Sequence, residues 1–358
     1  MNQNSNPSLG MAEISTVSLE QKMSQWFLRF SEQTSGSPMY QFLSIQVSQD
    51  PELIHLAKDA DSKQPAPNLF FAAVHFLLMQ NPSEELARYY PSLGGAFEAS
   101  SLMFKCFKDF CMKFSSQIGE ILKTRLVQTN EVQRCALLFP AVNFVSRKSG
   151  QSKLALVDVG VSGGLNFLMD KARLQYTDGQ AFGPQSASLQ IRCESKGNSI
   201  PTDQNAEIVD RIGIDLNPIN LLDKRERQWN LALIWPDQLE RIERFKAAIQ
   251  ILKSTLITFE RGSGNEVLPR AATKIPSNHL LCVMHSFTLN QFTKEEREAF
   301  DEVLSVISNN RDIWRISLEW IGTPQPEIIV SSYVSGKKIS QVKVAECSGH
   351  GEWIRWMV

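Results

Sequence analysis

An apolar run that ends in an acid and a glycine cluster does most to limit how this chain can fold. Residues 154–157 are all apolar, Asp158 follows, and glycines occupy positions 160, 163 and 164. A helix-like stretch covers residues 165–176. A short apolar run, a tight turn and a helix predict a buried strand that feeds a helix, which is the repeating unit of α/β proteins.

The chain before residue 150 has a helical pattern instead. Apolar residues such as Met23, Phe27 and Phe30 recur at three- and four-residue spacing, as they do on the buried face of a helix. Breaks rich in proline and glycine separate these segments. We therefore expect a loose tail over residues 1–18 and an all-helical domain over residues 19–150.

After residue 150, short β-rich runs alternate with helical segments. Thr293 and Glu296 form a capping box for a helix that reaches Ile307, and Pro236 suits the first turn of a helix that ends near Leu252. Two alternating runs between residues 327 and 347 flank a Ser-Gly turn, which predicts an antiparallel hairpin.

Together these patterns predict an α/β protein in which a mostly parallel sheet follows the helical domain. The sheet domain spans residues 151–358, begins near Lys153 and carries an inserted hairpin at about 177–208. A Rossmann-like sheet that ends in an antiparallel hairpin has the outline of the class I methyltransferase fold, although many activities share such sheets.

Composition excludes several classes of function. The formal net charge is -1 and the isoelectric point is about 6.6, so no overall positive field attracts nucleic acid. The first eighteen residues lack the basic and apolar regions of a signal peptide, and the longest apolar stretch, residues 69–79, is too short to span a membrane. The six cysteines include no C-x-x-C pair. We expect a cytoplasmic protein that binds neither nucleic acid nor membrane.

The glycine cluster admits three interpretations. In a methyltransferase, Asp158, Gly160, Ser162 and Gly164 would let the backbone pass close under S-adenosylmethionine. A dinucleotide fingerprint fails, because it needs glycine at positions 162 and 165. The third interpretation is the nucleophile elbow of a serine hydrolase. A tight turn with no ligand is the structural alternative to all three.

A serine hydrolase competes with the methyltransferase. Residues 160–164 match G-x-S-x-G around Ser162, and Asp215, His285 and His350 follow in hydrolase order. However, an α/β-hydrolase lays down several strands before this turn, whereas the preceding residues here are helical. The pattern therefore favours the methyltransferase.

A second acid after the next strand would hold the ribose of a nucleoside cofactor. Asp215 ends the β-rich run over residues 211–215 and is the candidate for this acid. The structural alternative to ribose binding is that its side chain caps a turn or the following helix. The next strand leads into a polar loop over residues 261–269, where Asn265 or Glu266 could contact the exocyclic amine of adenine, although any such connection has this composition.

Residues at the end of another apolar run are candidates for substrate chemistry. His285 and Ser286 follow residues 280–284, at the edge of the sheet where ligands bind. A histidine there can act as a general base or bind substrate, but a lone histidine is more often a hydrogen-bonded structural residue. Cys347 and His350 lack a second ligand pair, so we expect no metal site.

Six blocks of the sequence carry a family resemblance: residues 124–134, 157–166, 213–218, 233–238, 283–286 and 350–353. On these blocks the sequence resembles a largely bacterial family described only as domain of unknown function 2332, from about residue 19 to the end. The resemblance implies a fold and a pocket but no reaction, and it directs attention to Asn130, Glu131 and Arg134. These side chains could bind substrate or move a proton, or Glu131 and Arg134 could form a structural ion pair one turn apart.

The favoured hypothesis is an S-adenosylmethionine-dependent methyltransferase that acts on a small-molecule acceptor. Asp158, the glycine turn and Asp215 would bind the cofactor, and Glu131 and His285 are the candidates for deprotonating the acceptor. Asn130, Arg134 and Ser286 would bind substrate. A serine hydrolase and a non-catalytic protein that keeps the sheet for binding a partner remain the alternatives.

Overall fold

The chain forms two compact units in the computed structural model, which describes residues 18–34, 36–61, 64–201 and 206–358. Unit 1 comprises Met1–Val127 with Trp235–Gln238, and unit 2 comprises Gln128–Ile234 with Leu239–Val358. The expected tail lies outside the described residues, except for Ser18. Within the described residues, no helix is both long and apolar enough to cross a membrane.

Unit 1 is helical, as the spacing of apolar residues predicted. Ser18 begins the first helix with a capping box, and Pro38 occupies the first position of the second helix, where its missing N–H costs nothing. The elements are α1 (Leu19–Gln33), α2 (Pro38–Ser48), α3 (Pro51–Ala57), α4 (Ala66–Gln80), the 3-10 helices η1 (Glu85–Tyr89) and η2 (Pro91–Leu93), α5 (Ser101–Lys113) and α6 (Ser115–Thr124).

A short distant segment, residues 235–238, completes this helical unit. The Asp237 carboxylate accepts hydrogen bonds from Ser37 Oγ (2.6 Å) and the Met39 backbone N–H (3.1 Å), and the Trp235 ring packs against Phe30. The prediction that Pro236 begins a helix is therefore wrong. The next helix starts later because residues 235–238 are used to cover unit 1.

Unit 2 contains one large mixed sheet, and its described strands follow the order β3-β2-β4-β11-β10-β9-β8-β7-β1-β5-β6. The five strands β6, β5, β1, β7 and β8 are mutually parallel, while β9 is antiparallel to both β8 and β10. The strands are β1 (Lys153–Val159), β2 (Arg173–Tyr176), β3 (Ala181–Phe182), β4 (Gln190–Gly197), β5 (Glu207–Asp215), β6 (Thr258–Arg261), β7 (Leu280–Ser286), β8 (Ile313–Glu319), β9 (Glu327–Val334), β10 (Lys337–Cys347) and β11 (Trp353–Trp356).

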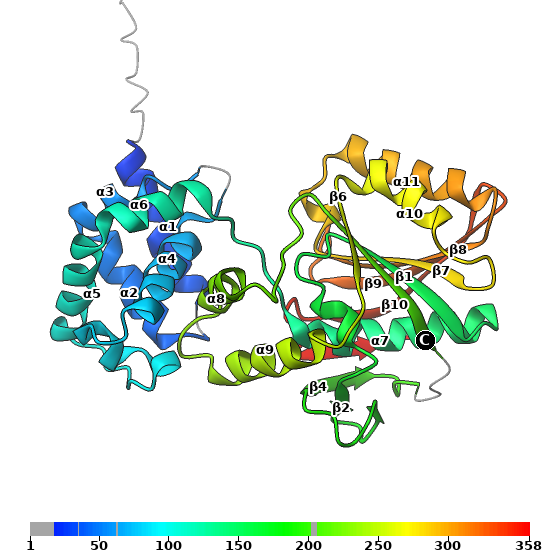
Figure 1. Cartoon of the computed structure of the whole chain (residues 1–358), viewed down its shortest axis with the longest axis horizontal. Coiled ribbons are helices and arrows are strands. Elements are labelled where there is room, and N and C mark those ends of the chain that lie inside the picture. The colour runs from blue at the N-terminus through cyan, green and yellow to red at the C-terminus, as the bar shows by residue number, and fades with distance from the viewer. Residues whose placement is uncertain (1–17, 35, 62–63, 202–205) are drawn as a thin grey trace, which may run out of the picture. The chain divides into compact units, whose positions relative to one another are not determined.

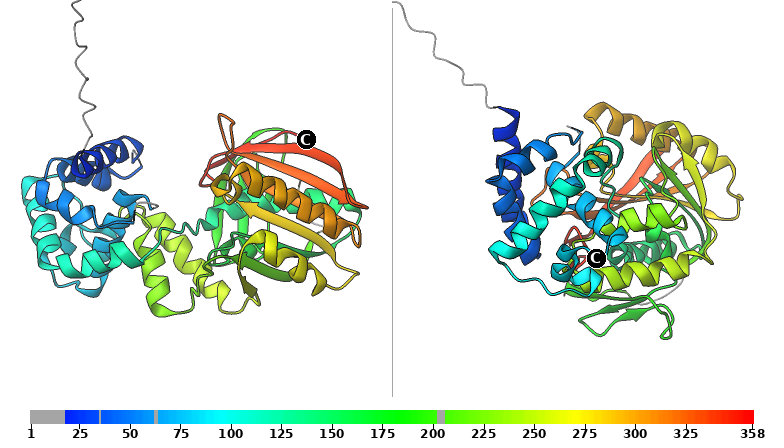
Figure 2. Two further views of the ribbon diagram at one scale, coloured as in Figure 1. Left: turned by 90° about the horizontal axis from the view of Figure 1, so that it is seen from above. Right: turned by 60° about the vertical axis from the view of Figure 1, so that its left-hand side comes forward.

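Helices cover both faces of this sheet (Figure 1). One face packs α10 (Gly264–Thr273) and α11 (Lys294–Ser308) against alternate residues of β1 and β7, and the other packs α7 (Cys135–Ser149) and α9 (Leu239–Leu252). Figure 2 shows α11 in orange along the C-terminal strands in red, with which it makes contacts. The sheet residues are buried on both sides, which explains their continuous apolar runs. The remaining described elements are η3 (Val132–Arg134), η4 (Leu165–Leu168), α8 (Lys224–Ala232) and η5 (Leu289–Gln291).

The α/β class, the N-terminal helices, the mostly parallel mixed sheet and the C-terminal antiparallel strands agree with the sequence-based prediction. The capping box at Thr293 is present and begins α11. Helix α7 belongs to unit 2, although its helical pattern placed it with the preceding helices.

Two local predictions are wrong. The helix expected over residues 165–176 is only the short η4, because burial then alternates along residues 173–176 and this segment pairs as β2. The loop expected over residues 261–269 contains the start of α10, which Ser263 caps.

The segment between β1 and β5 extends the main sheet. Strands β2 and β3 pair antiparallel, and β4 joins β2 to β11.

Candidate functional site

The site lies where the strand order of the sheet reverses. The chain passes from β1 to β5 and β6 on one side, then returns to β7 and β8 on the other. In the parallel register Asp158 is opposite Gly213, and Val159 is opposite both Ile214 and His285. Such a reversal leaves a crevice at the carboxyl ends of the strands, where α/β proteins bind ligands. Asp158 and Asp215 therefore lie on adjacent strand ends.

The glycine turn after β1 is held by the protein's own atoms. Gly160, Ser162 and Gly164 have φ values of +81°, +50° and +79°, a region that favours glycine. A Cβ at Gly160 would overlap with the side chain of Thr288, and hence no larger residue fits there. The turn is thus tight because of both its backbone conformation and its close packing.

Asp215 braces this turn. One carboxylate oxygen accepts the Ser162 backbone N–H (2.8 Å), and the other accepts the N–H of Asn217 (2.8 Å). A carboxylate has about four acceptor positions, so each Asp215 oxygen keeps capacity for a further donor. Capping a turn was the structural alternative to ribose binding for this residue, and the two backbone hydrogen bonds show that Asp215 does cap a turn.

Asp158 is the most perturbed acid of the crevice. The residue is 1% exposed, and its Oδ2 atom is buried with no hydrogen-bond partner in the part of the chain that the structure describes. Burial raises the pKa of Asp158 to about 8, and the nearby negative charge of Asp215 adds to the rise, while the Asn166 side chain and the Arg134 charge oppose it. Most molecules therefore carry a proton on this carboxyl group at pH 7.

Asn130 connects the crevice to α8. Its Nδ2 donates to Ser162 Oγ (3.0 Å) and to Asn230 Oδ1 (2.7 Å), and its Oδ1 accepts the Gly163 N–H (2.8 Å). The sequence contained no signal for Asn230, because a hundred residues separate it from Asn130.

Glu131 and Arg134 do not form the ion pair that was the structural alternative for these two residues. Glu131 Oε2 lies 2.6 Å from Arg241 Nε on α9, and Oε1 accepts the Gln133 N–H (3.1 Å). Arg134 instead donates from Nε to the Gly349 carbonyl (3.0 Å). Arg241 was missed because its helix shows only amphipathic spacing, which does not reveal a buried partner.

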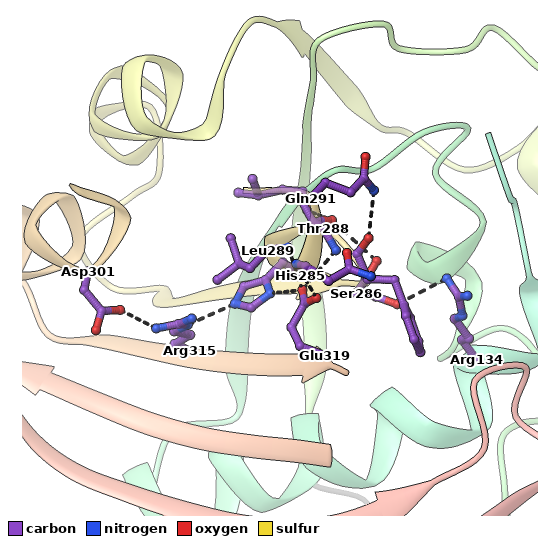
Figure 3. A network of polar contacts seen from close by, with 12 residues as sticks. Arg134, His285, Ser286, Thr288, Leu289, Gln291, Asp301, Arg315 and Glu319 are labelled. Carbon is purple, nitrogen blue, oxygen red and sulfur yellow. Dashed lines mark hydrogen bonds and ion pairs between the residues drawn. The ribbon is translucent and has the colours of Figure 1, made fainter. Parts of the chain in front are cut away.

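His285 is fully buried between two charged groups (Figure 3). Its Nδ1 lies 2.6 Å from Glu319 Oε1, and its Nε2 accepts a hydrogen bond from Arg315 Nε (2.9 Å). This arrangement defines a neutral ring with the proton on Nδ1. Burial lowers the pKa of His285, and the Arg315 charge lowers it further. No ring nitrogen is left to accept a proton from a substrate.

Glu319 fixes the loop that follows β7. Burial alone would raise its pKa, but hydrogen bonds with His285 and with backbone amides hold that pKa below the ordinary value. The amides are the N–H groups of Thr288 (3.0 Å), Leu289 (3.1 Å) and Asn290 (3.2 Å). Glu319 is the last residue of β8, so the rule that singled out Asp158 and Asp215 could have found it.

Two other predicted residues lie elsewhere on the sheet edge. Ser286 ends β7, and its Oγ is 3.5 Å from Arg134 Nη1. Asn265 is in the first turn of α10, where its Nδ2 donates to the Glu296 carbonyl (3.3 Å) while its Oδ1 is buried without a partner. Across the described part of the chain, no group of three or more His, Cys, Asp or Glu side chains is arranged to hold a metal ion.

Comparison with known proteins places the chain in a family. Neither the curated proteins nor the solved structures contain a significant match. A family model described as "Uncharacterized protein conserved in bacteria (DUF2332)" matches residues 24–356, and the chain therefore belongs to that family.

Proposed function

We propose that the protein is an S-adenosylmethionine-dependent methyltransferase that acts on a small-molecule acceptor. The observation that carries the proposal is the pair Asp158 and Asp215 at the ends of adjacent parallel strands, on either side of the glycine turn. In sheets of this type, a nucleoside lies across the strand reversal, with a carboxylate on its ribose.

The strand order also supports a class I methyltransferase-type, Rossmann-like sheet. Strands β6, β5, β1, β7 and β8 are parallel, and the antiparallel β9 follows them, in keeping with the doubly wound outline that ends in a hairpin. This protein extends that sheet beyond β10 with β11, β4, β2 and β3. Because fold alone does not establish chemistry, the proposal depends on the site residues.

The residues of the crevice fit S-adenosylmethionine. The unpartnered Oδ2 of Asp158 offers an acceptor for the ammonium group of the methionine part, and Asp215 has acceptor positions left for ribose hydroxyls. The glycine turn lets the backbone come close to the ligand. When bound, S-adenosylmethionine supplies an electrophilic methyl group on its sulfonium.

The chain's own residues would contribute mainly placement. Methyl transfer needs the acceptor aligned with the methyl group, so no nucleophilic side chain is required. Glu131 is engaged by Arg241, and both ring nitrogens of His285 are occupied, so their present partners cover the atoms that would accept a proton. We assign both residues to holding the site and Asp158 to balancing the charge of the cationic ligand.

Titration calorimetry with S-adenosylmethionine and S-adenosylhomocysteine tests the proposal. We expect binding by the wild type and at least a tenfold loss, about 1.4 kcal/mol, in Asp215→Asn. Asp210→Asn is the matched control, because Asp210 is also on β5 but pairs with His279. A folded wild-type protein that binds neither compound at millimolar concentration would contradict the proposal and favour a non-catalytic binding protein.

One observation favours a serine hydrolase as the second candidate. Ser162 has φ +50°, the strained conformation that a nucleophile elbow uses to expose its hydroxyl. Its Oγ accepts a hydrogen bond from Asn130, however, and no histidine contacts it among the residues that the structure describes. Labelling by a fluorophosphonate probe, abolished in Ser162→Ala, would establish the hydrolase over the methyltransferase.

A further inference from the structure

Arg134 carries a buried positive charge that no carboxylate of the described residues neutralises within 4.0 Å. The residue is 9% exposed. Its Nε donates to the Gly349 carbonyl (3.0 Å), and Nη1 has a long contact of 3.5 Å with Ser286 Oγ. The guanidinium lies over the Phe287 ring, 4.2 Å from its centroid. Neutral oxygens and an aromatic face thus surround a cation.

Two other deeply buried arginines of unit 2 have acidic partners. Arg211 pairs with Asp170, and Arg315 pairs with Asp301, although their side chains are buried to a similar extent. Removing a cation from water is costly unless an opposite charge or a full set of hydrogen bonds compensates. Arg134 therefore differs from arginines that stabilise the fold by ion pairing.

The acids whose charges act on Arg134 are engaged elsewhere. Glu131 is three residues away in sequence, but its carboxylate contacts Arg241, and the Glu319 carboxylate contacts His285. Burial raises the pKa of Asp158 to about 8, so this carboxyl group is mostly uncharged at pH 7. Burial lowers the pKa of Arg134 to about 10, which still leaves the guanidinium charged. The crevice therefore keeps a positive charge on this side.

The position of Arg134 places that charge at the proposed ligand site. Its contact Ser286 is the last residue of β7, and the preceding residue, His285, is opposite Val159 of β1. Figure 3 shows Arg134 beside Ser286, on the side away from Arg315. A planar guanidinium binds a carboxylate through two parallel hydrogen bonds, and the Ser286 hydroxyl can donate a third.

We infer that Arg134 and Ser286 form a subsite for a carboxylate group of a ligand. The subsite follows from the unpaired buried cation, but naming its ligand rests on the proposed function. Two molecules can bring the carboxylate into a methyltransferase: S-adenosylmethionine, through its methionine part, and an acidic acceptor. Both molecules would present a carboxylate to Arg134.

Binding measurements on the full chain separate these two sources. Calorimetry compares S-adenosylhomocysteine with 5′-methylthioadenosine, which lacks the amino-acid part, on the wild type, Arg134→Gln and Arg134→Lys. Thermal unfolding in sodium acetate, with sodium chloride at equal ionic strength as the reference, tests anion binding without a nucleoside. Arg211→Lys is the matched control for changing a buried arginine, and the lysine variant at position 134 keeps the charge if glutamine impairs folding.

Each outcome bears on the subsite. A tenfold or greater loss for S-adenosylhomocysteine at Arg134→Lys, with unchanged 5′-methylthioadenosine affinity, supports the subsite and assigns it to the methionine carboxylate. Unchanged affinity for both, with loss of the acetate-specific rise in Tm only at Arg134, supports an acidic acceptor. If no nucleoside binds, the proposed function fails while the acetate comparison still tests the subsite. Anion effects equal in the wild type and both Arg134 variants, with no Arg134-dependent loss of nucleoside affinity, overturn the inference.

Discussion

Replacing Asp158 with asparagine removes the buried carboxyl group while keeping the size of the side chain. In the folded protein the pKa of Asp158 is about 8, because burial disfavours its charged form. In the unfolded chain an aspartate has a pKa of about 3.9. Between these values the folded protein holds a proton that the unfolded chain has lost.

The sign and size of the effect follow from this difference. Proton release on unfolding favours the unfolded state more strongly as pH rises, so Asp158 lowers the free energy of unfolding by about 1.4 kcal/mol per pH unit. Asp158→Asn lacks this proton. Its free energy of unfolding, relative to the wild type, should therefore increase by about 4 kcal/mol between pH 5 and pH 8.

Urea unfolding at pH 5, 6, 7 and 8 measures this difference. The buried His285 and Glu319 also make stability pH-dependent, but both proteins contain them, and their contributions cancel on subtraction. A difference between variant and wild type that stays constant with pH would refute the conclusion that Asp158 is protonated in the folded crevice. If this difference decreased as pH rises, the conclusion that the pKa of Asp158 is raised in the folded protein would be refuted.

Ligand binding, the glycine turn and the loop after β7 each give a further prediction. Binding of S-adenosylmethionine at pH 7 should release about 0.9 proton, because Asp158 ionises beside the cationic ligand. Calorimetry in buffers of different ionisation enthalpy measures this release, and zero release would contradict the charge-balancing role of Asp158. Gly160→Ala should lower the free energy of unfolding in urea by about 3 kcal/mol, since Thr288 occupies the Cβ position. The control Gly150→Ala should lower it by about 1 kcal/mol, because no described atom lies within 4 Å of the added Cβ. Equal losses would show that packing against Thr288 does not matter. Glu319→Gln should lower the free energy of unfolding at pH 7 by about 2–3 kcal/mol and raise the rate of hydrogen exchange at the amides of residues 288–290. An unchanged exchange rate at these amides would contradict the conclusion that Glu319 holds this loop.

Local patterns in the sequence were sufficient for many elements. The capping box at Thr293 started α11 because its two hydrogen bonds involve residues only three positions apart. The apolar run before Asp158 became β1, and the alternating runs on either side of Gly336 became β9 and β10. These features depend on neighbours within one turn or one hairpin.

Local patterns misled where burial depended on distant partners. Residues 173–176 continue a stretch whose pattern resembles a helix, yet they form a strand. They pair with β4, which has hydrogen-bonding groups left to satisfy on the side away from β11. Residues 235–238 precede a helix in sequence, but Asp237 satisfies the start of α2 instead.

The amino-acid sequence by itself determined the period of each segment, the turn after Asp158 and the acids at two strand ends. Only the tertiary structure decided which side chains pair: Glu131 with Arg241 and His285 with Glu319, whereas Arg134 has no acid within 4.0 Å among the described residues. The physical reason is that periodicity identifies which face of an element is buried, whereas the partner on that face comes from a chain segment whose distance along the sequence leaves no pattern.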